Sequence, residues 1–429
     1  MLNDEEKRSI MALLHEQVVP AIGCTEPMAV ALCVARATEL LNAALAGAAK
    51  MVPERIELSL SANILKNAMG VGIPGTGGMV GLPIAIALGA IGGKSCLGLE
   101  VLRDCTPTDL DAAKRYIAED HIHIALEEED PDKLYIHVVV KAAGKEAEAC
   151  IKGSHTSFVE AGSHPAVESA KECESAGLTL QKVYEFATTM SLEDLSFILE
   201  AKQLNEAAAE EGLRENYGHQ LGKTMCSPLG RGIMGDSIFS KILSVTSCAC
   251  DARMAGAMIP VMSNSGSGNQ GICATMPVVV FARENHNTEE ELIRALTLSH
   301  LTAIYIKQSL GCLSALCGCV VASTGSSTGI TYLMGGTYEQ IAHSVKNMIA
   351  NLTGMICDGA KPSCALKLTT GVSTAVMSAM LAIQNKYVTS AEGIIEEDVD
   401  RSIHNLTSIG SRGMDVTDRF VLDIMTHKQ

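Results

Sequence analysis

The spacing of hydrophobic residues changes from helical to strand-like near residue 55. Before that point, Ile10, Leu13 and Leu14 would share one helix face, and residues 27–49, rich in Ala, Leu and Val, predict a second helix. Three later segments alternate between hydrophobic and polar residues as half-buried strands do: 56–60, 121–127 and 134–140. The third continues through a glycine-containing turn into residues 146–151, which predicts a hairpin.

After about residue 165 every periodic segment is helical. Sites that resemble capping boxes predict the starts of two long helices, one at Ser191 and one at Thr288. The polar stretch 206–217 is the expected domain boundary. We therefore predict an α+β protein, with a mixed N-terminal domain (1–210) that contains a small sheet and an all-helical C-terminal domain (211–429). The N-terminal helices are free to pack on the C-terminal half.

The charge balance argues against nucleic acid as a partner. The 429 residues include 33 Lys and Arg against 49 Asp and Glu, which gives a formal net charge of −16, and no basic run is present. Aromatic residues make up 3% and Trp is absent, so stacking surfaces for bases are scarce. Because 47% of the residues are apolar, the chain can instead form a large core.

Cysteine content and uncharged stretches bear on the compartment. Fifteen cysteines without a signal-peptide pattern predict reduced thiols in the cytoplasm. Residues 67–93 and 308–338 contain no charged residue, but they are rich in Gly, Ser, Thr, Cys and Pro rather than in Leu, Ile and Phe. That composition is poor for contact with lipid, so we expect both stretches to be buried inside protein, and we expect no membrane partner.

A glycine motif at residues 70–75 matches G-x-G-x-x-G. In a dinucleotide site this motif follows a strand directly and opens a helix. Here residues 63–69 look helical, and Pro74 and the following glycines indicate a longer irregular loop. We therefore expect a close-packed turn rather than a nucleotide site.

The segment Gly23–Pro27 precedes the second predicted helix. Proline suits a first helical turn, and Thr25 or Glu26 can cap the free amides. Cys24 would lie at the positive end of the helix dipole, which lowers the pKa of a thiol and favours thiolate. The competing interpretation is an inert, buried cysteine.

Five cysteines are grouped in two segments of the C-terminal half: Cys312, Cys317, Cys319, Cys357 and Cys364. They follow neither the spacing of a zinc ribbon nor that of a ferredoxin. Gly359 and Pro362 separate the last two cysteines, so this segment should bend as a loop. Three converging thiolates could hold an iron–sulfur cluster that leaves one iron open as a Lewis acid. The alternative is that these residues are small apolar groups in a tight core.

Two polar loops are candidates for binding a small ligand. Residues 263–271 offer backbone amides and the side chains of Asn269 and Gln270 to a carboxylate. His155 and Thr156, just after the predicted hairpin, lie in a similar loop. A plain surface loop and a structural histidine are the competing interpretations.

Together these segments resemble the L-cysteine desulfidase family, relatives of the iron–sulfur-dependent L-serine dehydratase alpha chain. The likeness runs in order over essentially the whole chain. It rests on five groups of residues: Gly23–Pro27; Ser61–Asn63 with Lys66 and Asn67; Pro74–Gly78; Gly268–Gly271; and Lys307 with Cys317, Cys357 and Cys364.

The resemblance assigns roles to four cysteines. In that family three cysteines hold a [4Fe–4S] cluster whose fourth iron binds the substrate. The corresponding residues here are Cys317, Cys357 and Cys364, with Cys319 as a second choice for the first ligand. Cys24 corresponds to the family's acceptor of the substrate α-proton. The resemblance also implies that the C-terminal half carries the cluster and that the protein is a homodimer.

The implied reaction is the β-elimination of L-cysteine to pyruvate, ammonia and sulfide, with the cluster in place of pyridoxal phosphate. His155, Thr156, Asn269 and Gln270 are candidates for holding the amino-acid substrate. Three alternatives stay open. The same cluster could eliminate water from L-serine or act on another β-substituted amino acid, the protein could bind an amino acid without catalysis, or the thiols could hold zinc.

Overall fold

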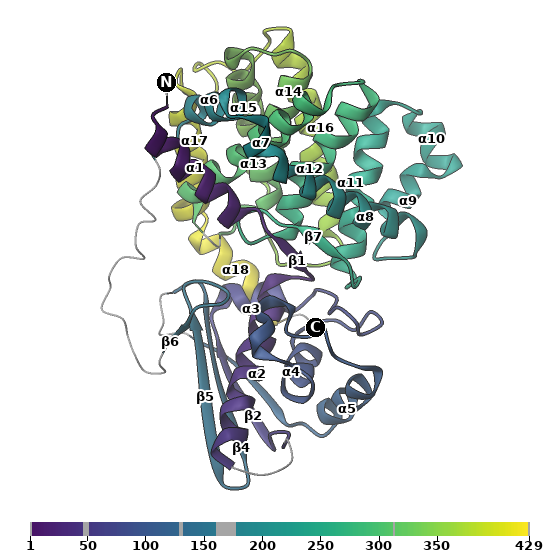
Figure 1. Cartoon of the computed structure of the whole chain (residues 1–429), viewed down its shortest axis with the longest axis vertical. Coiled ribbons are helices and arrows are strands. Elements are labelled where there is room, and N and C mark those ends of the chain that lie inside the picture. Colours follow the sequence, from purple (N-terminus) through teal and green to yellow (C-terminus); the bar gives the residue numbers. More distant parts are fainter. Residues whose placement is uncertain (1, 46–50, 128–131, 160–176, 312–313, 428–429) are drawn as a thin grey trace.

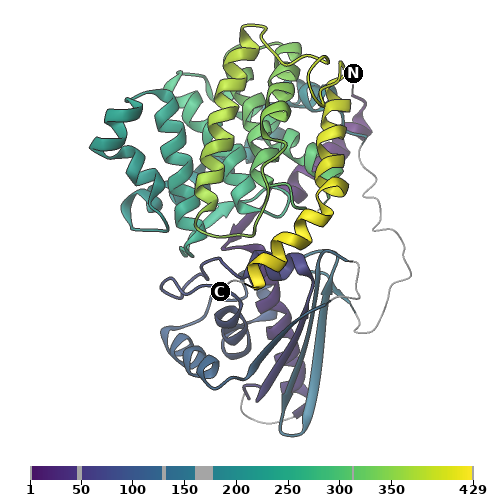
Figure 2. The ribbon, with the colours of Figure 1, turned by 180° about the vertical axis from the view of Figure 1, so that it is seen from behind.

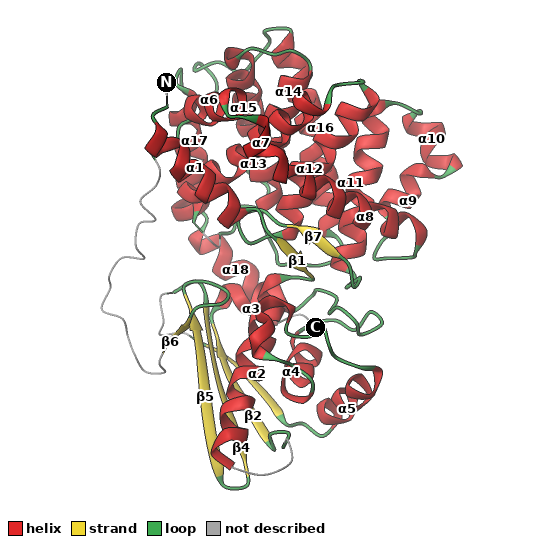
Figure 3. Cartoon of the chain, in the orientation of Figure 1, coloured by secondary structure: helices red, strands yellow, loops and turns green. Residues whose placement is uncertain are grey.

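The chain folds into a sheet part and a helical part, shown one below the other in Figure 1. The computed structural model describes residues 2–45, 51–127, 132–159, 177–311 and 314–427. The sheet part comprises the described residues between 24 and 159, and the helical part comprises the first helix and the described residues from 177 onward. This arrangement confirms the predicted α+β class (Figure 3).

The sheet has five strands in the order β3-β2-β4-β5-β6. Their bounds are Arg55–Leu60 (β2), Ile122–Leu126 (β3), Tyr135–Ala142 (β4), Lys145–Lys152 (β5) and Phe158–Val159 (β6). Strands β2 and β3 are parallel, and the other neighbours are antiparallel. Ile56, Leu58 and Leu60 are buried, which confirms the predicted alternation. One face of the sheet therefore packs on a core, while the other carries the polar residues.

The predicted hairpin is confirmed as β4 and β5. Its turn residues, Ala143 and Gly144, have φ values of 49° and 73°. Positive φ at both central positions produces a turn whose twist matches that of the flanking strands, and glycine adopts it without steric cost. Strand β3 also forms, but its Ile124 and Leu126 are exposed because β3 lies at the edge of the sheet.

Helix α2, Thr25–Leu45, covers the buried face of β4 and β5 and also packs on α4. The other helices of the sheet part are α3 (Ala62–Ala68), α4 (Leu82–Ile91), the 3-10 helix η1 (Ser95–Glu100) and α5 (Pro107–Ala118). Since α3 directly precedes the glycine motif at 70–75, the motif lacks the strand that a dinucleotide site needs. A Cβ on Gly72 would lie 2.4 Å from the carbonyl carbon of Ala255, so the motif is a close-packed turn, as predicted.

The helical part is built around α14, which packs against α12, α13, α15 and α16. Its helices are α1 (Asp4–Gln17), α6 (Leu180–Thr189), α7 (Leu192–Leu195), η2 (Ser196–Ile198), α8 (Leu199–Arg214), α9 (Leu221–Cys226), α10 (Pro228–Met234), α11 (Ile238–Met254), α12 (Gly268–Glu284), α13 (Glu289–Leu310), α14 (Gly318–Leu333), α15 (Tyr338–Leu352), α16 (Cys364–Ile383), α17 (Val399–Ser408), the π-helical turn η3 (Ile409–Gly413) and α18 (Asp415–Thr426). The buried α14 lies within the uncharged stretch 308–338, so this segment is interior, as expected.

The two predicted helix starts have different outcomes. Thr288 and Glu291 form a complete capping box at the start of the 22-residue helix α13, as predicted. Ser191 caps only the short helix α7, because the chain then passes through η2 before α8 begins at Leu199. The prediction of one long helix from Ser191 is therefore wrong, although the cap itself is present.

The linear division at residue 210 falls inside α8, which packs along α11 of the helical part. Helix α1 also packs on the helical part, against α13. At the other end, α18 descends to the sheet part (Figure 2) and contacts α3. There the buried Lys66 ammonium is paired with the Asp418 carboxylate. The N-terminal helix α1 thus belongs to the helical part, and the C-terminal helix α18 connects the helical part to the sheet part.

Two helices within the described residues, α2 and α16, are long and apolar enough to cross a membrane by length and composition alone. Both pack on other elements of the protein, α2 on the sheet and α4, and α16 on α14 and α15. Core helices pass the same composition test, so this feature is weak support for a membrane span.

Candidate active site

The segment between α1 and α2 forms a two-stranded antiparallel ribbon with a strand of the helical part. Strand β1, Pro20–Ile22, pairs antiparallel with β7, Pro260–Met262. The segment after β1 leads to Cys24, and the segment after β7 is the predicted polar loop 263–271. The hydroxyl of Thr25 lies 3.0 Å from the carbonyl oxygen of Gly266, so the start of α2 and this loop are in contact.

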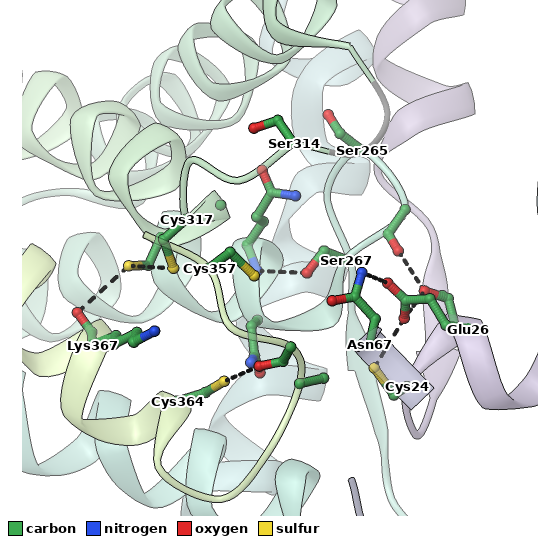
Figure 4. A pocket seen from close by; sticks show the side chains of 18 of the residues that line it. Cys24, Glu26, Asn67, Ser265, Ser267, Ser314, Cys317, Cys357, Cys364 and Lys367 are labelled. Atoms are coloured by element: carbon green, nitrogen blue, oxygen red, sulfur yellow. Dashed lines mark hydrogen bonds between the residues drawn. The ribbon is translucent and has the colours of Figure 1, made fainter. Parts of the chain in front are cut away.

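A cavity of about 120 Å³ lies where these segments meet the predicted cluster segments. The sheet part supplies one set of polar or thiol side chains to its wall: Cys24, Thr25, Glu26, Asn67 and His155. The helical part supplies a second set: Arg253, Ser265, Ser267, Asn269, Gln270, Lys307, Ser314, Cys317, Cys319, Cys357, Cys364 and Lys367. Figure 4 shows Cys24, Glu26 and Asn67 grouped on one side and Cys317, Cys357 and Cys364 on the other.

Backbone pairing brings the two cysteine segments together. The amide of Cys317 donates to the carbonyl of Met355 at 2.9 Å, and the amide of Cys357 donates to the carbonyl of Ala315 at 2.6 Å. Cys317 then precedes α14 directly, and Cys364 is the first residue of α16. The segment between Cys357 and Cys364 is an irregular loop, as its glycine and proline predict.

Four thiols of the helical part therefore line the cavity, and that of Cys317 is hydrogen-bonded to two of the others. Cys319 Sγ lies 3.3 Å from Cys317 Sγ, 3.2 Å from Met355 Sδ and 3.5 Å from the carbonyl oxygen of Lys367. Cys364 Sγ faces the carbonyl oxygen of Gly359 at 3.7 Å. Both choices for the first ligand, Cys317 and Cys319, are compatible with this geometry. Cys312, another cysteine of this region, lies outside the described residues.

The donor set fits an iron–sulfur cluster. Iron–sulfur clusters are held by cysteine thiolates, and the four thiols here come from loops and helix starts of the helical part. The hydrogen bond between the Cys317 and Cys357 thiols, together with burial, raises the pKa of Cys357 well above its ordinary value. Within the described ranges, no three His, Cys, Asp or Glu side chains are arranged to hold a single metal ion.

Cys24 immediately precedes α2, as predicted, but its expected ionisation is wrong. Burial raises the pKa of the Cys24 thiol well above its ordinary value, and the negative charge of Glu26 raises it further. Arg253 acts in the opposite direction without reversing the shift. Desolvation and a neighbouring carboxylate thus outweigh the helix dipole and favour the thiol of Cys24 over the thiolate.

Glu26 is the immediate partner of Cys24. Its Oε2 accepts from Cys24 Sγ at 3.1 Å, and its Oε1 accepts from Asn67 Nδ2 at 3.2 Å. Burial opposes ionisation of this carboxyl, but His155, the Cys24 thiol and Arg253 together bring its pKa below the usual value. Both shifts favour a protonated thiol beside an ionised carboxylate.

Several buried polar atoms of the wall have no partner among the described residues. They are Oε1 of Gln270, Nε2 of His155 and Nε of Arg253. Buried polar groups are nearly always hydrogen-bonded, so these atoms indicate a polar ligand in the cavity. Asn269 is engaged by Arg253, whose Nη1 donates to Asn269 Oδ1 at 2.9 Å. Thr156 is exposed and does not line the cavity.

Sequence reasoning misses the role of two wall residues. It assigns Glu26 only a capping role, although Glu26 lies two positions from Cys24. It assigns no role to Arg253, which is almost fully buried and whose Nη2 donates to the carbonyl of Gly23 at 2.9 Å. The one available signal was a cationic residue near the end of a helix that is otherwise mostly apolar, because buried charges are rare without a function or partner.

His300 is a buried residue that contacts Asn264 of the polar loop. Its protonation predicts that the folded protein loses stability in acid. Its Nδ1 accepts from Asn264 Nδ2 at 3.1 Å, and its Nε2 faces the Thr275 hydroxyl at 2.9 Å. Burial lowers the pKa of His300 to about 3. Since an unfolded histidine titrates near pH 6.5, the unfolded state binds more protons between about pH 3 and 6.5. Stability should therefore fall as pH is lowered through this window, by up to ~1.4 kcal/mol per unit from this residue.

Urea unfolding of the cluster-free protein at pH 7, 6 and 5 measures this effect. The His300→Gln variant, which keeps polar groups at the position, should lose less stability between pH 7 and pH 5 than the unsubstituted protein. An identical loss in both proteins would show that His300 does not determine the acid sensitivity.

Gly359 holds the loop between Cys357 and Cys364 against the sheet part. Its φ is +88°, and a Cβ there would lie 2.3 Å from the carbonyl oxygen of Lys66. We expect Gly359→Ala to displace the loop, to cost ~1–3 kcal/mol of stability and to lower the iron content after reconstitution. Gly354→Ala is the matched control, because its Cβ would meet nothing within 4 Å. Equal iron content in the two variants would contradict this role for Gly359.

Comparisons with known proteins agree with this arrangement. The family model of the serine dehydratase alpha chain matches residues 97–423. A UPF0597 protein of Bacteroides thetaiotaomicron is 63% identical over 433 residues, which cover 99% of each chain. UPF0597 proteins of Porphyromonas gingivalis and Actinobacillus pleuropneumoniae are 49% and 43% identical, over 100% and 99% of this chain and 100% and 98% of their own lengths. The chain belongs to the serine dehydratase alpha chain family.

Proposed function

We propose that the protein is a [4Fe–4S]-dependent lyase that eliminates sulfide from L-cysteine and so yields pyruvate and ammonia. Family membership supports a lyase-like role in general. The observation that carries the finer proposal is that Cys24, from the start of the chain, and the thiols of Cys317, Cys357 and Cys364 line the same cavity. A thiol that can exchange a proton thus lies opposite a set of thiols suited to a cluster.

The proposed cluster ligands are Cys357, Cys364 and either Cys317 or Cys319. A cluster held by three of these thiolates would supply a Lewis acid for the departing heteroatom of the substrate. The pocket is small, and Cys24, Arg253 and Gln270 of its wall are buried, so a bound amino acid would lose part of its contact with water. Such shielding strengthens every electrostatic contact inside the site.

The other wall residues suit the two charged groups of an amino acid. The unpartnered Oε1 of Gln270 is an acceptor for an ammonium group, whereas Nε2 of His155 and Nε of Arg253 are suited to a carboxylate. Because the three atoms are already buried, binding satisfies them at little additional desolvation cost.

Cys24 is the proposed acceptor of the α-proton. Removal of that proton and loss of the β-substituent leave aminoacrylate, which water converts to pyruvate and ammonia. A positioned proton acceptor of this kind typically contributes 10²–10⁴-fold to the rate, as an order of magnitude. We further propose that the protein is cytoplasmic, since reduced thiols and an oxygen-sensitive cluster require a reducing compartment. We also propose that it is a homodimer.

The principal alternative is the elimination of water from L-serine at the same site, and family membership favours it as the second candidate. Anaerobically reconstituted protein should be given L-cysteine and L-serine separately, with sulfide and pyruvate measured. A higher kcat/KM for L-cysteine supports the desulfidase proposal, and a higher value for L-serine replaces it with a dehydratase. Amino-acid binding without either product would indicate a non-catalytic member of the family.

A further inference from the structure

We propose that Glu26 is the proton acceptor of Cys24, so that the two side chains act as a catalytic dyad rather than Cys24 acting alone. This inference rests on the proposed function and adds a second residue to its proton transfer. Cys24 Sγ and Glu26 Oε2 are 3.1 Å apart, within the distance for a hydrogen bond that involves sulfur. Both residues line the cavity, so both are available to a bound substrate.

Besides Cys24, two neighbouring side chains contact the Glu26 carboxylate, those of Asn67 and Thr25. Asn67, on α3, donates to Oε1 at 3.2 Å. Thr25 lies 3.1 Å from Oε2 and 3.0 Å from the carbonyl of Gly266, which belongs to the polar loop. A hydroxyl has one hydrogen, so when Thr25 donates to Gly266 the Oε2 atom keeps its lone pairs for Cys24. The carboxylate is thereby oriented with one oxygen fixed and the other facing the thiol.

The state of Cys24 explains why a partner is needed. Burial and the Glu26 charge raise the pKa of the thiol, so the thiolate is scarce near neutral pH. A thiol can accept a proton from carbon only if its own proton leaves at the same time. Glu26, whose pKa is below the usual value, is the ionised group within hydrogen-bond distance that can take it.

The charged and titratable groups that face the dyad come from several elements. Arg253, at the end of α11, lowers the pKa of both members and favours their ionised forms. Cys364, at the start of α16, raises the pKa of Cys24 slightly when ionised. His155, after β5, faces Glu26, and its own pKa is lowered by burial. Lys307, on α13, acts on His155 in the same direction.

The proposed step conserves atoms and charge. Cys24 Sγ takes the proton of the substrate Cα while the thiol proton of Cys24 passes to Oε2 of Glu26. The electron pair of the broken C–H bond forms the Cα–Cβ double bond, and the Cβ–S bond breaks with its electrons remaining on the departing sulfur. Glu26 then gives its proton to the departing sulfide and returns to the carboxylate, while Cys24 is again a thiol because it holds the proton taken from Cα.

The test compares Glu26→Gln with the unsubstituted protein in two preparations. In cluster-free protein, the rate of Cys24 alkylation by iodoacetamide is followed at pH 8 by peptide mass spectrometry. Removal of the carboxylate charge should make alkylation several-fold faster. In reconstituted protein, the same variant should keep its iron but release sulfide about 100-fold more slowly or worse. A thiol that ionises more easily would thus be a poorer catalyst, the opposite of what a lone cysteine base predicts.

The pH profile separates catalysis from a structural role. In the unsubstituted enzyme, kcat/KM should fall at acid pH as Glu26 becomes protonated. The residual activity of Glu26→Gln should instead rise steadily with pH, because solvent must then ionise Cys24. Glu26→Asp, which keeps the carboxylate on a shorter side chain, should recover part of the activity. Glu16→Gln is the control, because Glu16 is an exposed residue of α1.

Three results with the reconstituted enzyme would overturn the dyad. These are sulfide release by Glu26→Gln close to that of the unsubstituted enzyme, a pH profile of unchanged shape, and loss of activity in parallel with loss of iron. Unchanged alkylation of Cys24 in the cluster-free variant would also overturn it, and that readout needs no turnover. If the unsubstituted protein eliminates neither sulfide nor water, the proposed function fails, while the alkylation rates still show whether Glu26 controls Cys24.

Discussion

Replacement of Cys357 by serine should abolish both cluster binding and turnover. Cys357 lies in the loop that pairs with the segment before Cys317, and its thiol is hydrogen-bonded to that of Cys317. A serine hydroxyl is a harder ligand with a much higher pKa, so only two thiolates of the proposed set would remain. The measurement is the iron content per chain and the visible absorbance after anaerobic reconstitution. The backbone hydrogen bond from residue 357 to Ala315 does not involve the side chain, so we expect the fold to persist.

Cys96→Ser is the control for this substitution, because the Cys96 thiol is exposed and does not line the cavity. It should retain full iron content and activity. Iron binding and sulfide release by Cys357→Ser at the level of this control would contradict the assignment of Cys357 as a ligand. The same measurement on Cys317→Ser and Cys319→Ser identifies the first ligand. The cysteine whose replacement abolishes iron binding is the one that holds the cluster.

Replacement of Cys24 by alanine should leave the cluster intact and abolish turnover. The thiol lies on the side of the cavity opposite the three proposed ligands, so its removal does not reduce their number (Figure 4). Without it the α-proton has no positioned acceptor, and we expect a loss of roughly 10²–10⁴-fold in kcat/KM. The measurement combines visible absorbance with sulfide release from L-cysteine.

Cys24→Ser serves as the near-isosteric companion of this variant. It keeps a hydrogen-bond donor toward Glu26, so it should preserve local packing while remaining almost as inactive as the alanine variant. If the colour disappears together with the activity in either protein, Cys24 is a structural residue or a ligand rather than the proton acceptor.

Local patterns predicted most of the fold. Alternation at Ile56, Leu58 and Leu60 identified β2, and the capping box at Thr288 identified the start of α13. Errors arose where context beyond the local pattern decides the outcome. The cap at Ser191 is genuine, but η2 interrupts the helix that follows it. Likewise β3 alternates as predicted, yet Leu126 is exposed because the strand lies at an edge of the sheet.

The site shows the same division between local and tertiary information. The order of the cysteines and the resemblance to a family selected four thiols that share one cavity. The ionisation of Cys24 could not be predicted, because it depends on burial and on the orientation of Glu26. Arg253 reaches the cavity only because β7 and the polar loop bring the end of α11 beside Gly23. Tertiary packing, rather than spacing in the chain, produces these contacts.

Anaerobic reconstitution with iron and sulfide, followed by iron analysis and a sulfide-release assay with L-cysteine, tests the central claim most directly. Our account predicts the uptake of one [4Fe–4S] cluster per chain and the formation of sulfide and pyruvate in equal amounts. A chain that takes up no iron would contradict it, and Cys317, Cys357 and Cys364 would then be core residues with no role in cofactor binding.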